Sequence, residues 1–163
     1  MATISAYKLD TADGAWKMLD LVVNLADQQV LTLQDAAVVT WPKGNKKPRM
    51  KHHEGQTAKD AKLGAFWGML FGLIFFVPFF GMAVGAVMGA LHGHFNKYGI
   101  DDDFIKSAQE KVTEGTSALF LMTSDAETDK VAAALKANNL NFEMFYTDLS
   151  KAQEQLLHEE FAA

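Results

Sequence analysis

The order of hydrophobic and polar positions divides the chain into an alternating first part, a long apolar middle and an alternating last part. In the first part, residues 3–9 alternate as in a strand, residues 16–30 carry apolar side chains at helical spacing, and residues 36–41 form a β-branched run. This order predicts a strand, a helix and a second strand. Asp10 or Thr11 is the expected cap of the helix.

The last part repeats the same order of elements. Residues 116–122 and 141–147 have the patterns of strands, and the helix between them is expected to begin at a capping box, Ser124–Glu127, and to run to about Ala137. A second capping box at Ser150–Gln153 predicts a C-terminal helix. Two strand–helix–strand units predict an α+β fold, in which a ferredoxin-like arrangement joins both units in one antiparallel sheet.

The apolar middle contains no Asp, Glu, Lys or Arg from Leu63 to Asn96. Glycine at every fourth position lies on one helix face and lets a second helix approach closely, as in membrane helix pairs. Two such series are present and are expected to set helix packing and oligomerisation as a glycine zipper: Gly64, Gly68 and Gly72, then Gly81, Gly85, Gly89 and Gly93.

Pro78 divides this segment into two predicted helices, residues 61–77 and 79–95. Gly72 and Gly81 are nine residues apart, so one straight helix would put the two glycine series on opposite faces. A hairpin turn at Pro78 instead allows the two series to face each other. Each helix would be roughly 25 Å long, slightly less than the roughly 30 Å hydrocarbon core of a bilayer.

Bulky aromatic side chains surround the predicted turn. An apolar surface of this kind favours contact with lipid or with a neighbouring subunit, and periodicity fits both environments equally. A membrane hairpin and a hairpin buried in a protein assembly are therefore alternatives. The residues expected in this contact are Phe66, Trp67, Phe71, Phe75, Phe76, Phe79 and Phe80.

A basic segment precedes the apolar middle. Residues 42–62 hold seven of the fifteen basic residues in the chain. Basic flanks mark the cytoplasmic side of membrane segments, and a solvated loop is the equal alternative. Within this segment, Gly44-Asn45 has turn chemistry and predicts a hairpin that returns a short strand at Arg49–His53.

The domain prediction follows from these patterns. Residues 1–60 and 97–163 form a discontinuous ferredoxin-like α+β domain, and residues 61–96 form an apolar helical hairpin inserted into it. A chain of 163 residues has the length expected for one domain with such an insertion.

Composition narrows the classes of function. The net charge of −5 argues against general nucleic-acid binding, which requires a basic surface. Without cysteine, the chain has no disulfide, zinc–thiolate site or thiol nucleophile. The opening residues MATISAYKLD lack the basic and apolar regions of a signal peptide. We expect the protein at the cytoplasmic side of the inner membrane, or in the cytoplasm if the hairpins are buried in an oligomer.

Candidate chemistry is sparse. His52 and His53 precede the apolar segment and His92 and His94 lie near its end, so a closed hairpin could bring both pairs together as a metal or proton-sensing cluster. Capping or interfacial histidines are the simpler interpretation. Residues 101–103, all Asp, lack the alternation of a calcium loop and predict a helix cap. Phosphate-loop, dinucleotide and serine-nucleophile motifs are absent from the sequence. The sequence therefore predicts no enzyme, catalytic residue, cofactor, metal or identifiable small-molecule substrate.

Several motifs together carry a family resemblance: LQDAAVV in the first part, the glycine series around a central proline, YGIDDDFI, and SALFLM. With this layout the chain resembles a bacterial and archaeal family of small proteins of unknown function, described as membrane proteins. The resemblance covers nearly the whole chain and implies the same domain plan and an association with membranes or stress response. It supplies no catalytic residues. The phenylalanines around Pro78 are bulkier than is typical of the family.

These observations predict a non-enzymatic structural protein that is membrane-associated or self-assembling through its glycine-zipper hairpin. The expected partners are further copies of the chain and membrane lipid. A soluble homo-oligomeric ring or shell with the hairpins buried inside is one alternative. A small-molecule-binding sensor that uses the face of the sheet is another.

Overall fold

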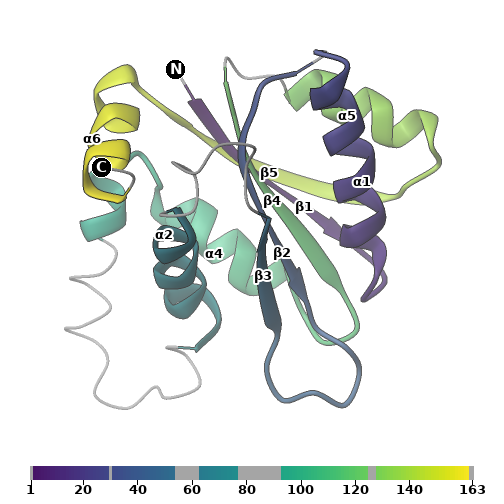
Figure 1. Cartoon of the computed structure of the whole chain (residues 1–163). Helices are drawn as coiled ribbons and strands as arrows, with labels where there is room; N and C mark the ends of the chain where they lie inside the picture. The colour runs from purple at the N-terminus through teal and green to yellow at the C-terminus, as the bar shows by residue number, and fades with distance from the viewer. Residues whose placement is uncertain (1, 30, 54–62, 77–92, 125–127, 162–163) are drawn as a thin grey trace.

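The structure is a computed structural model that describes residues 2–29, 31–53, 63–76, 93–124 and 128–161 (Figure 1). The elements, in chain order, are β1 (Ala2–Leu9), α1 (Gly14–Asp27), β2 (Leu33–Thr40), β3 (Arg49–His53), α2 (Leu63–Phe71), the π-helix η2 (Gly72–Phe76), α4 (Asp102–Lys111), β4 (Ser117–Ser124), α5 (Thr128–Ala137), β5 (Phe142–Leu149) and α6 (Lys151–Phe161).

The five strands form one antiparallel sheet with the order β3-β2-β4-β1-β5. β1 lies between β4 and β5, so Ile4 is paired with Met122 on one side and with Thr147 on the other. β3 forms one edge of the sheet and pairs with β2. The predicted α+β class with an antiparallel sheet is confirmed, and the short strand expected at Arg49–His53 is β3.

α1 and α5 cover one face of the sheet (Figure 1). The apolar residues of α1 recur every three or four positions, so Met18 and Val22 both point to the sheet and are fully buried. They share a core with Val131 and Leu135 of α5 and with Leu121 of β4. The helical spacing in the sequence therefore identified the buried side of α1.

α2, η2, α4 and α6 lie on the opposite face of the sheet (Figure 1). Phe120 of β4 is the aromatic centre of this second core, with its ring centroid 4.7 Å from that of Phe71 and 6.2 Å from that of Phe104. Leu157 of α6 is buried in the same cluster. The two faces of the sheet thus bury two separate hydrophobic clusters, as expected for strands whose side chains alternate between apolar layers.

The first part of the apolar segment belongs to this second core. α2 and η2 together follow most of the helix predicted for residues 61–77, and they pack on the sheet. The sheet offers an apolar face that α2 can cover, and the sequence pattern gave no sign of this pairing. Residues 77–92, which include Pro78 and most of the second predicted helix, lie outside the described residues. Within the described ranges, no helix has the length and apolar character needed to cross a bilayer.

Two of the predicted helix starts are confirmed. Oδ1 of Asp101 accepts a 2.8 Å hydrogen bond from the backbone N–H of Phe104, so Asp101 caps α4. At α6, the backbone N–H of Ser150 donates to Oε1 of Gln153 and the backbone N–H of Gln153 donates to Oγ of Ser150, the reciprocal bonds of a capping box.

Of the other two predicted starts, one lies mostly outside the described residues and one is wrong. The capping box expected at Ser124–Glu127 includes residues 125–127, which the structure does not describe, so this start stays a prediction. Ser124 itself ends β4, and its Oγ accepts a hydrogen bond from the side chain of Gln34. α1 begins at Gly14, later than expected from Asp10 or Thr11, and its N-cap residue makes no side-chain capping bond.

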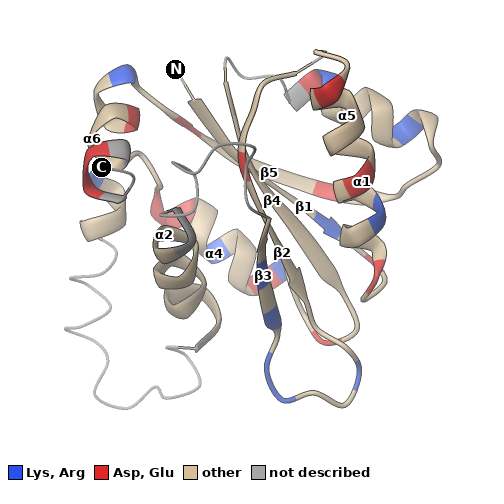
Figure 2. Ribbon diagram, viewed as in Figure 1, with Lys and Arg blue, Asp and Glu red and all other residues tan. Residues whose placement is uncertain are grey.

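The turn between β2 and β3 forms the hairpin expected from Gly44-Asn45. Gly44 has a φ of +89°, a left-handed conformation that glycine adopts without strain. Figure 2 shows that Lys and Arg are concentrated along this hairpin, which extends at the end of the molecule away from the N-terminus. Trp41 stands at its base, where its indole N–H donates a 2.8 Å hydrogen bond to the backbone oxygen of Asn45.

Candidate functional site

A buried carboxylate lies under the first helix of the apolar segment. Asp35 of β2 is 1% exposed. Its Oδ2 accepts a 2.8 Å hydrogen bond from the indole N–H of Trp67 in α2, and both carboxylate oxygens lie within 2.8 Å of Nε2 of His52 in β3. The three side chains come from three different elements, so this cluster joins α2 to the edge of the sheet.

A β-bulge aims Asp35 at α2. The pairing of β2 with β4 shifts register between Leu33 and Asp35, which places Gln34 as an extra residue in β2. Leu33 packs with the cluster under α1, whereas Asp35, two residues later, contacts Trp67 on the opposite face. Without the shift, strand alternation would place both side chains on the same face. The bulge therefore positions Asp35, the only acid of β2, under α2 of the apolar segment.

Burial raises the pKa of Asp35 above its ordinary value of 3.8, while the hydrogen bonds from Trp67 and His52 act in the opposite direction. The ionised carboxylate only accepts hydrogen bonds, so Nε2 of His52 carries a hydrogen in that state. The His52 side chain is 14% exposed, which gives the cluster a route for proton exchange with water. The arrangement can fix α2 on the sheet and can take up a proton. Among the described residues, its side-chain partners include no hydroxyl or thiol nucleophile.

A second polar cluster holds the end of the apolar segment to α6. The hydroxyl of Tyr98 donates to Oε2 of Glu160, and Nζ of Lys97 lies 3.2 Å from Oε1 of the same carboxylate. Nε2 of His94 lies 3.3 Å from the Tyr98 hydroxyl. The hydrogen bond from Tyr98 lowers the pKa of Glu160, and burial together with Glu160 raises the pKa of Tyr98. Both described ends of the segment are thus tied to the rest of the domain by polar contacts.

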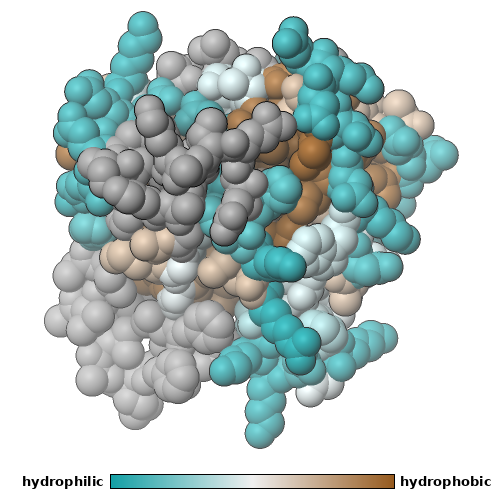
Figure 3. Space-filling view, in the orientation of Figure 1, coloured by the Kyte–Doolittle hydropathy of each residue, from teal (hydrophilic) through white to brown (hydrophobic). Residues whose placement is uncertain are grey.

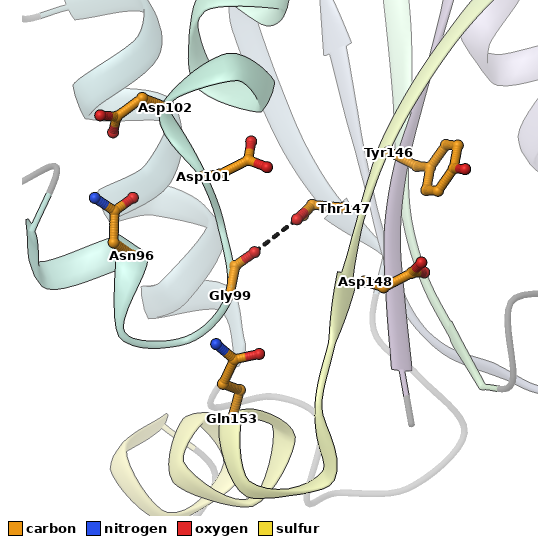
Figure 4. A pocket seen from close by; sticks show the side chains of 8 residues that line it. All are labelled: Asn96, Gly99, Asp101, Asp102, Tyr146, Thr147, Asp148 and Gln153. Carbon is orange, nitrogen blue, oxygen red and sulfur yellow. Dashed lines mark hydrogen bonds between the residues drawn. The ribbon is translucent and has the colours of Figure 1, made fainter.

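A polar pocket of about 650 Å³ opens beside the start of α4 (Figure 4). Its carboxylates already have partners, because Asp101 caps α4 and Oδ1 of Asp148 accepts a 2.7 Å hydrogen bond from Thr3. Across the pocket, the hydroxyl of Thr147 donates to the backbone oxygen of Gly99 at 2.6 Å (Figure 4). The lining residues are Asn96, Gly99, Asp101, Asp102, Tyr146, Thr147, Asp148 and Gln153. The bond between Thr147 and Gly99 holds the segment before α4 against β5.

The structure places four of the predicted contact residues in the chain's own core. Phe66, Trp67, Phe71 and Phe75 are at most 4% exposed, and all four pack in the cluster that contains Phe120. Their predicted contact with lipid or a neighbouring subunit remains a prediction, and it would require these rings to leave this core. Phe76 ends η2, and Phe79 and Phe80 lie outside the described residues.

The glycine series is described only in part. A Cβ atom added at Gly68, Gly72 or Gly93 would meet no described atom within 4 Å. Gly64 lies in α2. Of the second series, Gly81, Gly85 and Gly89 fall outside the described residues, so the zipper contact between the two series is a prediction.

The histidines that the structure describes have separate partners. His52 contacts Asp35 in β2, and His94 contacts Tyr98, close to α6. His53 lies in β3 opposite Ala36, and His92 is not described. No group of three or more metal-ligating side chains occurs within the described part of the chain.

Sequence reasoning missed Asp35. Two signals could have identified it: Asp35 is an acid inside the mostly apolar strand LQDAAVV, and Trp67 carries an indole N–H in a segment without charged residues. Each group needs a polar partner when it is buried. Their pairing, however, depends on the bulge and on the placement of α2, which neither sequence pattern contains.

One family model matches the chain. It covers residues 61–162, more than half of the chain, and describes a protein of unknown function, DUF1269. The matched region contains Trp67 and the elements from α2 to α6, whereas Asp35 and His52 precede it. No curated protein matches the chain, and no solved structure matches it.

Proposed function

We propose that this chain, which belongs to the DUF1269 family of proteins of unknown function, is a non-enzymatic structural protein that associates with membranes or with copies of itself through its apolar segment. Within the segment, the glycine face of α2 is the proposed contact. The Asp35 cluster then has a positioning role, because it fixes the helix that presents this face.

The outer face of α2 and η2 is the observation that carries this proposal. The inner face, with Phe66 and Trp67, is buried on the sheet. The outer face bears Ala65, Gly68, Met69 and Gly72, none of them charged, and Met69 is 43% exposed. Glycines four residues apart on an uncharged face allow a second helix to approach closely, in lipid or in a protein assembly.

A glycine-zipper hairpin is the proposed arrangement of the whole segment. The second series, which ends at Gly93, has the same spacing of four residues as the series in α2. Gly93 is itself exposed and begins the helical turn before Tyr98. A hairpin turn at Pro78 would bring the second series to the outer face of α2, either within one chain or between two copies.

The domain that presents this segment is proposed to be ferredoxin-like. The order β2-β4-β1-β5 with α1 and α5 on one face is the order expected when two antiparallel strand–helix–strand units interlock. β3 extends this sheet beyond β2. The domain would lie at the cytoplasmic side of the inner membrane, with the apolar segment nearest the lipid.

The burial of Phe66, Trp67 and Phe71 favours one alternative, a soluble homo-oligomeric ring or shell. In that case these rings never contact lipid, and only the outer glycine face would meet neighbouring subunits. The protein would then be cytoplasmic.

Membrane fractionation of cells that express the full chain tests the proposal. We expect wild type to sediment with membranes after a high-salt wash, or to elute without detergent as one large species. Gly68→Leu should reduce whichever association is found, because leucine blocks the close approach of a second helix. Ala133→Leu, a similar change at an exposed position of α5, is the control. Equal association of wild type and Gly68→Leu would refute the role of the glycine face.

A further inference from the structure

The β2–β3 hairpin concentrates positive charge in an acidic protein. Residues 36–53 contain five basic residues and no Asp or Glu, whereas the whole chain has a net charge of −5. Without these five charges the net charge would be −10. All five side chains are exposed, and Figure 3 shows hydrophilic side chains projecting at this end of the molecule. We call these residues the basic hairpin: Lys43, Lys46, Lys47, Arg49 and Lys51.

Exposed apolar side chains border the basic hairpin. Trp16 of α1 is 39% exposed and Met50 of β3 is 38% exposed. Nζ of Lys51 lies 5.7 Å from the centroid of the Trp16 ring, so cation and aromatic ring form one surface. Lys51 and Met50 are adjacent in an edge strand and therefore point to opposite faces of the sheet. The edge thus presents basic and apolar groups together.

The basic hairpin lies at the same end of the domain as the last described turn of the apolar segment. Trp41, at the base of the hairpin, contacts Phe75 of η2 edge-to-face, with ring centroids 6.5 Å apart. Phe75 is therefore a point at which the described apolar segment meets the base of the basic hairpin.

We propose that the basic hairpin is an electrostatic docking surface for the anionic lipid headgroups of a membrane, with Trp16 and Met50 at its apolar margin. This inference rests on the proposed membrane association and adds the class of lipid. Clusters of Lys and Arg beside an apolar segment attract anionic lipids, and tryptophan is enriched at the headgroup level. A flat anionic surface can contact the five basic side chains at this edge, and one acid beside the turn, Glu114, already accepts a hydrogen bond from the backbone N–H of Gly44.

Protection of the sheet edge is the competing explanation for part of this charge. Edge strands often carry Lys or Arg because charges discourage pairing with another sheet. Arg49 and Lys51 belong to β3, but Lys43, Lys46 and Lys47 lie in the turn outside it. The turn lysines can therefore be changed without changing the edge strand.

Vesicle sedimentation of the full chain tests the proposal. Wild type is compared with K43Q/K46Q/K47Q on vesicles of phosphatidylcholine alone and of phosphatidylcholine with phosphatidylserine. The matched control is K106Q/K136Q/K151Q, which removes three exposed lysines elsewhere. Wild type and control should bind the anionic vesicles in a salt-sensitive manner. The turn variant should bind them on the order of 100-fold more weakly, since each basic residue near an anionic surface contributes roughly fivefold.

The outcomes separate this inference from the proposed function. Strong binding of wild type and the turn variant alike, to neutral and anionic vesicles, would overturn the docking surface while supporting membrane association through the apolar segment. Binding of wild type to neither vesicle would overturn both the docking surface and membrane association, and would leave self-association as the proposed function. Preferential binding of wild type to a homopolymeric RNA, lost in the turn variant, would overturn the assignment to lipid.

Discussion

The indole N–H of Trp67 donates a 2.8 Å hydrogen bond to Oδ2 of Asp35, a residue 32 positions earlier in the chain. Both groups are buried, so neither can exchange this partner for water. A buried polar group without a partner costs roughly 1–3 kcal/mol, so any placement of α2 that separates Trp67 from Asp35 is disfavoured. The bond therefore helps to specify where α2 lies on the sheet.

Removal of the Asp35 carboxylate should destabilise the fold. Asp35→Ala leaves Trp67 and His52 without their acceptor and should lower the free energy of unfolding by roughly 2–4 kcal/mol. Asp35→Asn keeps a carbonyl oxygen that can accept the bond from Trp67, so it should lower the free energy of unfolding less. Urea denaturation of both variants at neutral pH measures the difference. An Asp35→Ala protein as stable as wild type would show that the cluster does not hold α2.

The raised pKa of Asp35 predicts a pH dependence of stability. Below the ordinary pKa of 3.8, the carboxyl is protonated in both the folded and the unfolded state. As the pH rises through the raised pKa of the folded state, the unfolded state releases its proton more readily, so the contribution of Asp35 to stability falls. Asp35→Asn cannot titrate. The stability of wild type relative to Asp35→Asn should thus decrease as the pH is raised above 3.8.

Urea denaturation of both proteins across this pH range provides the measurement. The comparison cancels the titration of the other carboxyl groups, which both proteins share. A difference in stability that stays constant with pH, or grows as the pH rises, would contradict the direction of the shift.

Phe71 and Met69 lie on opposite sides of α2 and provide a matched pair. Phe71 is buried against Phe120, so Phe71→Ala should lower the free energy of unfolding by roughly 3–5 kcal/mol. Met69 is 43% exposed, and Met69→Ala should change it by less than about 0.5 kcal/mol in a single chain. Thermal or urea unfolding compares the two. Similar small effects of both changes would indicate that α2 does not form part of the domain core.

Gly99 and Gly44 both have a positive φ, but only Gly99 lacks space for a side chain. A Cβ at Gly99 would lie 2.7 Å from Oε1 of Gln153, whereas a Cβ at Gly44 would meet no described atom within 4 Å. Gly44→Ala should lower the free energy of unfolding by about 1–2 kcal/mol from backbone strain alone. Gly99→Ala should lower it further, because Gln153 belongs to the α6 capping box and its side chain would have to move. Chemical denaturation that ranks the two variants in the reverse order would contradict this difference.

The sequence predicted local elements better than their packing. Alternation and helical spacing predicted the strands, and the caps at Asp101 and Ser150 are short-range hydrogen bonds that depend on a few neighbouring residues. Asp10 and Thr11 show the limit of such patterns, because α1 begins only at Gly14 and its N-cap residue makes no side-chain capping bond. A capping residue thus indicates a nearby helix start without fixing its position.

The candidate site was less accessible to sequence reasoning. The apolar character of Phe66 and Phe71 fits lipid, a subunit interface or the chain's own sheet, and only the tertiary structure shows that they cover Phe120. The pairing of Asp35 with Trp67 likewise depends on a bulge that reverses one strand's alternation. The burial of these two rings and the pairing of Asp35 with Trp67 both depend on contacts between segments distant in the sequence, which periodicity does not encode.

Detergent-free extraction followed by size-exclusion chromatography with light scattering tests the proposed role of the apolar segment. If the outer face of α2 mediates association, the full-length chain will be retained in the membrane pellet or will elute as an assembly well above its monomer mass of 17.9 kDa. Complete recovery in the soluble fraction at 17.9 kDa would contradict that role.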